Sequence, residues 1–430
     1  MPTGPGKVPG PIRSIRAVSS PLARPAAGPA GPPVAARAEA DACPGALRLH
    51  DAADGPLARI RIPGGRLTGA RIAALRGLAR EWGDGHAELT SRANLQLRAL
   101  RGAPPAELAE RLAAAGLLPS ATHELVRNIA GSPLLGDPAP VTALDAALCA
   151  DPALAALPGR FLFAIDDGSG DVAFSADVAS LPSGAILFAG RDLGLRVPAG
   201  AAAGALLTAA HAFLRLAGQD VAAGRRRPWR VRELADGPAR MAAETAAALG
   251  IAPGEPDPSL RRPPLREPIG IVGSGARVAV GALVPLGRLG DAALRALESA
   301  PELVITPWRG VVVPELTPPE ARAWVRTLAG AGLDVSPGSR WAGVTACAGR
   351  PGCAKSLADV RSDADAATRA GSGLPVHWVG CARGCGSPAG PHVRVEATGS
   401  GYAVGTVDRP PGRPVPVGEV AAAVAVLRKG

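Results

Sequence analysis

Four cysteines near the end of the sequence place the strongest limit on what this chain can fold into. They occur as Cys347-Ala-Gly-Arg-Pro-Gly-Cys353 and Cys381-Ala-Arg-Gly-Cys385, which is C-x5-C followed by C-x3-C. Four thiolates are the usual ligand set of an iron–sulfur cluster. Structural zinc sites space their cysteines by about two to four residues, so only the second pair suits zinc, and disulfide frameworks belong to small secreted domains. The spacing therefore predicts an iron–sulfur cluster, with zinc and disulfides as the rival interpretations.

The length and composition indicate a multidomain protein with an acidic ligand. A chain of 430 residues with 47% hydrophobic residues is long enough for two or more domains with substantial cores. Its net charge of +10 and pI of about 10.2 favour acidic partners. The sequence lacks the zinc-finger spacing and the aromatic-rich sheet motif of common nucleic-acid binders. We therefore expect a polyanionic small molecule rather than nucleic acid.

The N-terminal segment and the hydropathy together predict a cytoplasmic protein. No apolar run approaches the roughly 18 residues that a membrane helix needs. Residues 1–40 are rich in Pro, Ala, Gly and Arg and lack the apolar core of a signal peptide. A composition of this kind is typical of a disordered extension. Without export the thiols stay reduced, as cluster ligands require.

An internal repeat predicts a duplicated α+β module. Around Leu57 and again around Arg277 the chain shows a strand-like alternation, a turn that ends in Gly-Arg-Leu, and a helical pattern rich in Ala and Leu. A second strand follows in each copy, expected at 88–98 and 303–313, and a second helical pattern follows each strand. The order strand, helix, strand, helix thus occurs twice, about 220 residues apart.

The strand expected at 88–98 carries a row of polar side chains. Alternate residues of a strand share a face, and this row consists of Thr90, Arg92, Asn94, Gln96 and Arg98. One interpretation is a half-exposed strand whose polar face lies in water. The other is the wall of an anion-binding cleft, because guanidinium groups pair bidentately with carboxylates.

Further candidates for such a cleft lie in other segments. Arg127 follows the first module in a loop and Arg160 opens an apolar strand, so the repeat would bring both near Arg92. Trp308 occupies the position equivalent to Arg92 in the second copy. It is either a core residue or a face for a flat macrocycle, and its neighbour Arg309 joins it as a substrate-binding candidate.

Three other features carry less weight. The arginine run at 225–232 is either a solvated face or a contact for ligand carboxylates or an electron donor. Gly273-Ser-Gly275 lacks the third glycine of a dinucleotide loop and is expected to form a hairpin turn. Cys149 lies in an apolar helical pattern and is expected in the core, whereas Cys43 is either structural or close to the cleft.

These motifs together resemble the sulfite/nitrite reductase superfamily. The resemblance extends from about residue 41 to residue 430 and rests on the duplicated module, the cysteine set, Thr90-Ser-Arg92, Arg127-Asn128, Leu157-Pro158 and Arg160-Phe161. It implies that Cys347, Cys353, Cys381 and Cys385 hold a [4Fe–4S] cluster. In the superfamily the last of these cysteines also bridges to the iron of a sirohaem, and basic residues above the macrocycle bind a small oxyanion.

The resemblance implies an α+β fold of duplicated ferredoxin-like modules with two mixed α/β reductase-type domains in a pseudo-two-fold arrangement. The expected limits are an extension at 1–40, a first ferredoxin-like half-domain at 41–122, a first reductase-like domain at 123–258, a second half-domain at 259–338 and a [4Fe–4S]-binding domain at 339–430.

One position departs from the reductase pattern. The reductases carry two lysines in a Leu-Pro-Arg-Lys-Phe-Lys type of run, whereas this chain has Arg160 at the first position and Leu162 at the second. An apolar side chain removes charge where the reduction of a small oxyanion needs it. The Ala-Cys-Pro-Gly-Ala-Leu-Arg-Leu start at Ala42 and the Pro-Gly-Arg-Phe-Leu-Phe-Ala run at Pro158 are more similar to the precorrin-3B synthase branch of the superfamily.

That branch implies an O2-dependent hydroxylation of precorrin-3A with γ-lactone formation in aerobic cobalamin biosynthesis. Precorrin-3A is a macrocycle fringed with carboxylates, which suits a basic cleft. The cluster would deliver electrons one at a time, from NADH through a reductase or from a ferredoxin. The resemblance also implies a mononuclear non-haem iron, whose ligands the sequence does not identify. Catalytic roles would fall to Arg92, Arg127 and Arg160, and substrate binding to Asn94, Gln96, Arg98, Trp308 and Arg309.

Two other functions remain open from the sequence. A sirohaem-dependent sulfite or nitrite reductase has the same cysteine set and the same repeat. A non-catalytic iron–sulfur or nucleic-acid-binding protein is suggested by the charge alone.

Overall fold

The structure is a computed structural model that describes residues 43–429 apart from 199, 264–266, 389 and 407. The expected extension at 1–40 lies outside the described residues. Residues 38–430 form one compact unit, which is described by itself below. Its mixed α+β architecture with a duplicated module confirms the predicted fold class.

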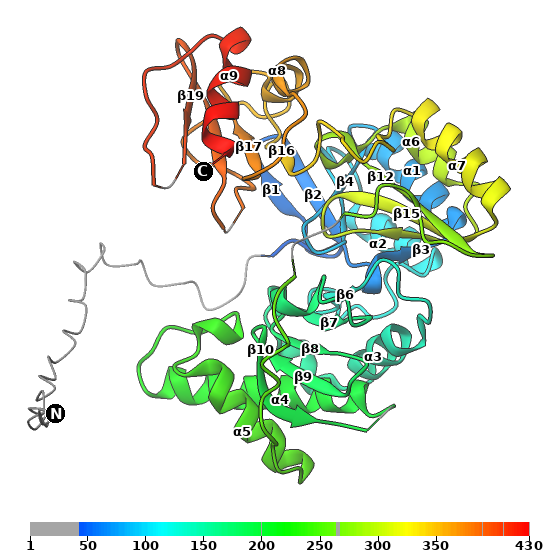
Figure 1. The fold of residues 1–430 in the computed structure, drawn as a ribbon, viewed down its shortest axis with the longest axis vertical. Coiled ribbons are helices and arrows are strands. Elements are labelled where there is room, and N and C mark those ends of the chain that lie inside the picture. Colours follow the sequence, from blue (N-terminus) through cyan, green and yellow to red (C-terminus); the bar gives the residue numbers. More distant parts are fainter. Residues whose placement is uncertain (1–42, 199, 264–266, 389, 407, 430) are drawn as a thin grey trace, which may run out of the picture. The chain divides into compact units, whose positions relative to one another are not determined.

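The duplicated modules form two five-stranded antiparallel sheets with matching strand orders (Figure 1). The first sheet runs β1 (His50–Ala52), β2 (Gly55–Ile60), β5 (Leu95–Leu97), β4 (Ala87–Leu89), β13 (Arg288–Leu289). The second runs β11 (Gly270–Val272), β12 (Val278–Leu283), β15 (Gly310–Leu316), β14 (Leu303–Ile305), β3 (Arg66–Leu67). The β11–β12 hairpin confirms the turn predicted at Gly273-Ser-Gly275.

Four helices pack with these sheets and continue the repeat. They are α1 (Gly69–Trp82), α2 (Pro105–Ala114), α6 (Asp291–Leu297) and α7 (Pro318–Gly330). Figure 1 shows α1, α6 and α7 close together, and α1 and α6 contact each other directly. The start of α7 is fixed by a capping box, because Glu320 accepts a hydrogen bond from the backbone N–H of Thr317 at 2.8 Å. One continuous apolar core fills both modules.

The two modules exchange their shortest strands. β13 of the second copy pairs with β4 of the first, and β3 of the first copy pairs with β14 of the second. Leu67 and Leu289 occupy equivalent positions in these strands and are 1% and 0% exposed. Each sheet therefore obtains its fifth strand from the other copy, which joins the two cores.

We expect Leu289→Ala to lower the free energy of unfolding by about 2–5 kcal/mol, because the substitution leaves a cavity in this shared core. Chemical denaturation of both proteins measures the difference. Leu134→Ala is the control, because Leu134 is 44% exposed, and we expect a change within about 0.5 kcal/mol. Equal stability of the Leu289 variant and the wild type would contradict this role.

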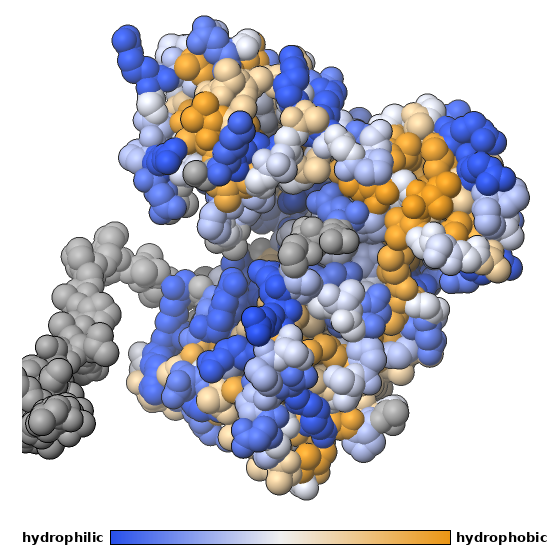
Figure 2. Space-filling view, viewed as in Figure 1, coloured by the Kyte–Doolittle hydropathy of each residue, from blue (hydrophilic) through white to orange (hydrophobic). Residues whose placement is uncertain are grey.

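A third sheet follows the first module. Its order is β10 (Arg191–Arg196), β9 (Ala185–Phe188), β8 (Val178–Ser180), β7 (Phe163–Ile165), β6 (Ile129–Gly131). Helices α3 (Ala139–Ala150), α4 (Ala202–Ala222) and α5 (Gly237–Leu249) complete this region, and α4 contacts both α3 and α5. Cys149 is partly buried near the end of α3. The exposed arginines 225–227 lie in the loop between α4 and α5, where Figure 2 shows a hydrophilic surface.

A fourth, four-stranded sheet follows the second module. Its order is β16 (Val344–Ala346), β17 (Val376–Val379), β18 (Val393–Thr398), β19 (Gly401–Gly405). Helices α8 (Val360–Ala367) and α9 (Val417–Arg428) pack against it. Across the described parts of the chain, we find no helix that combines the length and the apolar character needed to cross a membrane.

The single strand predicted at 88–98 is wrong, because the structure has two strands joined by a turn. The Thr90 side chain accepts hydrogen bonds from the backbone N–H groups of Arg92 and Asn94 at 3.3 and 3.1 Å. These local bonds compete with a continuous ladder, and Ala93 adopts a positive φ of 55°. The five polar side chains therefore do not share one face.

The second copy repeats this turn, so the strand predicted at 303–313 is also divided. Thr306 Oγ1 accepts a hydrogen bond from the backbone N–H of Gly310 at 2.9 Å. Arg309, within the turn, has a φ of 62°. Thr90 and Thr306 thus play equivalent roles in the two modules.

Glu267, at the end of the proline-rich linker, has a buried carboxyl oxygen without a hydrogen-bond partner among the described residues. Burial raises the pKa of Glu267 from 4.5 to about 7. A carboxyl group with a raised pKa in the folded state favours folding below both pKa values, and this contribution is lost as the pH rises through about 7.

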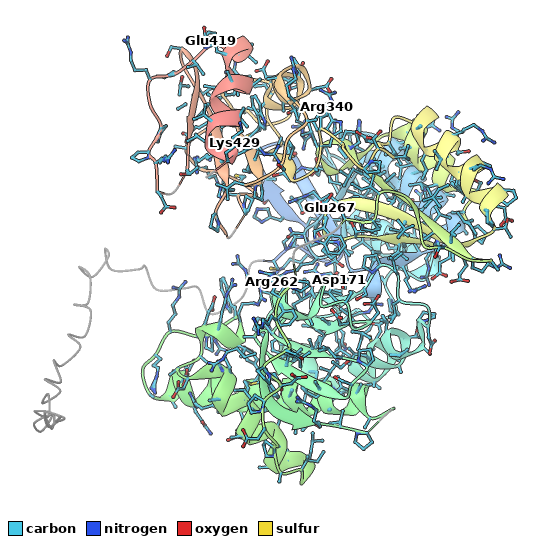
Figure 3. The ribbon with its side chains drawn as sticks, viewed as in Figure 1. Asp171, Arg262, Glu267, Arg340, Glu419 and Lys429 are labelled. Atoms are coloured by element: carbon cyan, nitrogen blue, oxygen red, sulfur yellow. The ribbon has the colours of Figure 1, made fainter. Side chains whose placement is uncertain are left out.

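We therefore expect Glu267→Gln to match the wild type near pH 4 and to be more stable at pH 8, by on the order of 1–2 kcal/mol. Thermal unfolding followed across this pH range measures the divergence. Glu419→Gln, at an exposed position of α9 (Figure 3), serves as the control and should follow the wild type throughout. Parallel curves for wild type and Glu267→Gln would contradict the expected ionisation.

Candidate functional site

All four cysteines of the C-x5-C and C-x3-C pairs line one cavity of about 630 Å³, which we call the cysteine cavity. Its walls come from the first module, the second module, the loops near β7 and α5, and the fourth sheet. The structure thus brings the predicted cluster ligands together with residues up to about 340 positions away in sequence.

Two of the cysteines sit just beyond the ends of neighbouring parallel strands. Cys347 directly follows β16, and Cys381 follows β17 after Gly380. The Cys347 N–H donates to the carbonyl of Trp378 at 2.9 Å, and the Gly380 N–H donates to Cys347 Sγ at 3.2 Å. Because parallel strands end at the same edge of a sheet, this pairing places Cys347 and Cys381 at one edge of the fourth sheet.

The other two cysteines are held by tight turns. The Cys353 N–H donates to the Gly349 carbonyl at 2.7 Å, and the Gly384 N–H donates to the Cys381 carbonyl at 3.2 Å. Gly380 allows the loops to approach, because a Cβ atom there would lie 1.8 Å from Ser356 Oγ. Cys385 is the exposed member of the set.

Among the described residues, the sulfur atoms are not gathered as closely as a single zinc ion requires. A tetrahedral zinc site with bonds of about 2.3 Å brings its sulfurs within about 4 Å of one another. Among the described residues, no three of these sulfurs lie within 4.8 Å of one another. An iron–sulfur cluster holds its thiolates farther apart, because each ligates a different iron. Burial raises the pKa of Cys347, a cost that metal binding to the thiolate offsets.

His377, which lies in β17, contacts the backbone of Cys385. It is 1% exposed, and its Nε2 lies 3.0 Å from the carbonyl oxygen of Cys385. Its Nδ1 lies 2.7 Å from Thr345 Oγ1 on the neighbouring strand β16. Burial lowers the pKa of His377 to about 4, so the ring is neutral near pH 7.

Cations outnumber carboxylates in the cysteine cavity. Its lining includes seven arginine and lysine side chains, which are Arg59, Arg98, Arg160, Arg309, Lys355, Arg361 and Arg383. The carboxylates of the lining are Asp54 and Glu88. This excess suits a ligand with several negative charges.

Two of these arginines are paired with the two carboxylates. Arg98 binds Asp54 through two hydrogen bonds of 2.6 and 2.7 Å. Arg361 pairs with Glu88 and donates from Nε to the Cys347 carbonyl at 3.1 Å. Arg361 thereby links β4 of the first module to the first cysteine.

Arg309 has no hydrogen-bond or ion-pair partner for its guanidinium among the described residues. Burial is the main cause that lowers its pKa, and Glu88 opposes this effect. A desolvated cation in the wall of a cavity is a strong candidate for binding an anion. Arg309 lines the cysteine cavity, and its substrate-binding role stays a prediction.

Arg160 lines the same cavity together with an aromatic residue. The guanidinium of Arg160 lies over the ring of Trp229 at 4.7 Å from the centroid, in a cation–π arrangement. Neighbouring Arg230 pairs with the buried carboxylate of Asp177 at 2.5 Å. The arginine run at 225–232, which contains Trp229, was one of the segments that the sequence offered as a contact for ligand carboxylates. Trp229 itself was not predicted as a site residue.

The remaining predicted residues occupy different places. Gln96 lines the cavity and accepts a hydrogen bond from Arg59 at 2.8 Å. Asn94 is 1% exposed and bonds to Ile62 N–H and Asn128.

Two predicted catalytic arginines are absent from the cavity lining. Arg92 donates to the Gly159 carbonyl at 3.2 Å, and burial with nearby Arg230 lowers its pKa to about 10. Arg127 is 5% exposed and pairs with Asp145 at 2.6 Å. In this structure Arg127 therefore stabilises the loop before β6 rather than facing the cysteines.

Trp308 lines a different cavity of about 720 Å³. The other walls come from the loop after β7 and from the linker, including Asp171 and Arg262 (Figure 3). Burial raises the pKa of Asp171 to about 6. The structure therefore separates Trp308 from its sequence neighbour Arg309, which lines the cysteine cavity.

Three other lining residues were missed by sequence reasoning, and they are Arg59, Arg361 and Arg383. Arg383 lies between Cys381 and Cys385, so its position in the sequence is a local signal of its proximity to the site. Arg59 and Arg361 contact Gln96 and Glu88 of the first module, and the sequence pattern does not reveal these contacts.

The first module and the fold are both similar to those of known reductases. Residues 50–115 match the model of the nitrite/sulfite reductase ferredoxin-like half domain. The duplicated α+β architecture matches the structure of Mycobacterium tuberculosis NirA, with a TM-score of 0.62 and 19% identity over 85% of this chain and 79% of that chain. Residues 50–115 thus resemble a nitrite/sulfite reductase half domain, and the chain shares the fold of NirA.

The similar sequences are ferredoxin–nitrite reductases. The protein from Leptolyngbya laminosa is 41% identical over 80 residues, and the protein from Synechococcus elongatus is 42% identical over 82 residues. These matches cover 18% and 19% of this chain and 16% of each relative. They concern a small part of each protein and do not distinguish the precorrin-3B synthase branch.

Proposed function

We propose that this protein is an iron–sulfur oxidoreductase whose cysteine cavity binds a tetrapyrrole carrying several carboxylates. The observation that carries the proposal is the meeting of four cysteines and seven cationic side chains in one cavity. Cys347, Cys353, Cys381 and Cys385 would hold a [4Fe–4S] cluster, which supplies single electrons when bound.

The protein side chains would bind and orient the macrocycle. Arg309 offers an unpaired guanidinium, and Arg160 is held in place over Trp229. Arg98 and Arg361 are neutralised by their carboxylate partners. They are therefore expected to shape the cavity rather than to bind ligand carboxylates.

The first candidate reaction is the reduction of nitrite or sulfite at a sirohaem. It is supported by the half-domain match and by the similarity to ferredoxin–nitrite reductases. In this case the sirohaem would be resident, and a ferredoxin would be the electron donor.

The second candidate is the precorrin-3B synthase reaction, with precorrin-3A as the substrate and O2 as the co-substrate. Leu162 favours it, because the reductase pattern has a lysine at this position. The Leu162 side chain is 6% exposed and belongs to an apolar cluster. This position therefore presents no cation to a small oxyanion. A mononuclear iron belongs to this candidate alone.

Anaerobic purification followed by pigment extraction tests the class and separates the two reactions. Bound sirohaem together with nitrite or sulfite turnover supports the first candidate. A pigment-free protein with precorrin-3A-dependent O2 uptake supports the second. A protein that holds iron and sulfide but binds neither sirohaem nor precorrin-3A would overturn the tetrapyrrole proposal.

A further inference from the structure

We infer that His377 is a positioning residue that orients Cys385 through a hydrogen bond to its backbone carbonyl. This inference rests on the proposed cluster-binding function of the cysteine cavity. It concerns a contact between protein groups, and it assigns no proton transfer to the histidine.

The need for such a support arises from the backbone around Cys385. Gly384 and Gly386 flank this cysteine, and both have positive φ angles, of 63° and 84°. Glycine leaves the chain free to adopt many conformations, and Cys385 is exposed. A ligand on such a turn needs a contact from a rigid element to keep one orientation.

His377 provides that contact from the centre of the fourth sheet. It lies in β17, which pairs with β16 on one side and β18 on the other. Its Nε2 lies 3.0 Å from the Cys385 carbonyl oxygen. The ring also packs beside the turn, because a Cβ atom on Gly386 would lie 3.4 Å from His377 Cε1.

The hydrogen-bond partners determine which ring nitrogen carries the proton. A carbonyl oxygen only accepts hydrogen bonds, so Nε2 must be the donor to Cys385. On the other side of the ring, Nδ1 lies 2.7 Å from Thr345 Oγ1. Thr345 is 8% exposed and directly opposite His377 in the parallel ladder. Thr345 therefore helps to hold the ring in the orientation that supports Cys385.

The experiment compares variants that keep or remove the donor. His377→Gln retains an N–H group at a similar distance from the backbone, whereas His377→Phe fills the space without a donor. His392→Phe is the matched control. Its ring lies 6.4 Å from that of His377, and its Nδ1 bonds to the Gly390 carbonyl instead.

We expect His377→Phe to lose iron to a chelator about tenfold faster than the wild type, as the loss of one buried hydrogen bond predicts. The reduced cluster should also show a shifted midpoint potential and an altered electron paramagnetic resonance spectrum, because the orientation of a ligand changes. His377→Gln should restore wild-type values, and His392→Phe should leave them unchanged.

Thr345→Val supplies a second route if His377→Phe does not fold. It keeps the ring but removes the hydroxyl that bonds to Nδ1, and we expect a smaller shift of the potential in the same direction. Equal cluster properties in the wild type, His377→Phe and Thr345→Val would overturn the inference. A wild-type protein without a cluster would instead refute the proposed function, so the two failures are distinguishable.

Discussion

Cys385→Ser is expected to abolish the iron–sulfur cluster. Serine keeps the shape of the side chain but replaces the thiol by a hydroxyl, which stays protonated near neutral pH and is a poor ligand for iron. Cys385 lies on an exposed turn and lines the cysteine cavity with the other three cysteines of the set. We expect iron and acid-labile sulfide to fall by more than about tenfold per chain.

Iron and sulfide analysis, together with the visible spectrum of anaerobically purified protein, measures this loss. Cys149→Ser is the matched control, because Cys149 lies in α3 outside the cavity lining and burial raises its pKa. Its iron content should equal that of the wild type. Wild-type amounts of iron and sulfide in Cys385→Ser would refute the ligand assignment.

The second large effect is expected for Arg309→Met. Methionine approximates the length of arginine but removes the unpaired charge from the cavity wall. We expect the affinity for sirohaem or precorrin-3A to fall about ten- to hundredfold, as for the loss of a charge-assisted hydrogen bond. The visible absorbance of the cluster should be unchanged.

The same substitution should increase the stability of the ligand-free protein, because it removes a desolvated charge that has no ion-pair partner among the described residues. Equilibrium binding and thermal unfolding test the two effects together. Arg322→Met, at an exposed position of α7, is the control for charge alone. Unchanged affinity in Arg309→Met would contradict its role in anion binding.

The cysteine site could be predicted because its signal is local. The C-x5-C and C-x3-C pairs both lie within residues 347–385. The chemistry of thiolate ligands limits the metal groups that four such cysteines can bind. The duplicated module was also readable, since Gly-Arg-Leu and the following helical pattern recur in both copies. These features needed no knowledge of long-range contacts.

The polar row at 88–98 was misassigned for a physical reason. The alternation satisfied the pattern of a strand, but the Thr90 hydroxyl offered the backbone a competing set of hydrogen bonds. Because of this turn, Arg92 bonds to the Gly159 carbonyl, whereas Gln96 and Arg98 line the cavity. The Thr90 hydroxyl thus separates Arg92 from the other two predicted site residues.

The wider cavity could not be read from the sequence because it depends on tertiary pairing. Arg361 reaches the site through Glu88, which is 273 positions away, and Trp229 reaches it beside Arg160. The exchanged strands β3 and β13 contain two residues each, too few to show a period of alternation.

The exchange of β3 and β13 has a consequence for how a ligand enters. A hinge that separated the two modules would break the β13–β4 and β3–β14 hydrogen bonds and expose Leu67 and Leu289. A hinge opening between these two modules is therefore unfavourable in free energy. Ligand entry to the cysteine cavity therefore does not depend on separating the two modules, and the cavity keeps its cysteines and its cationic wall on one continuous framework.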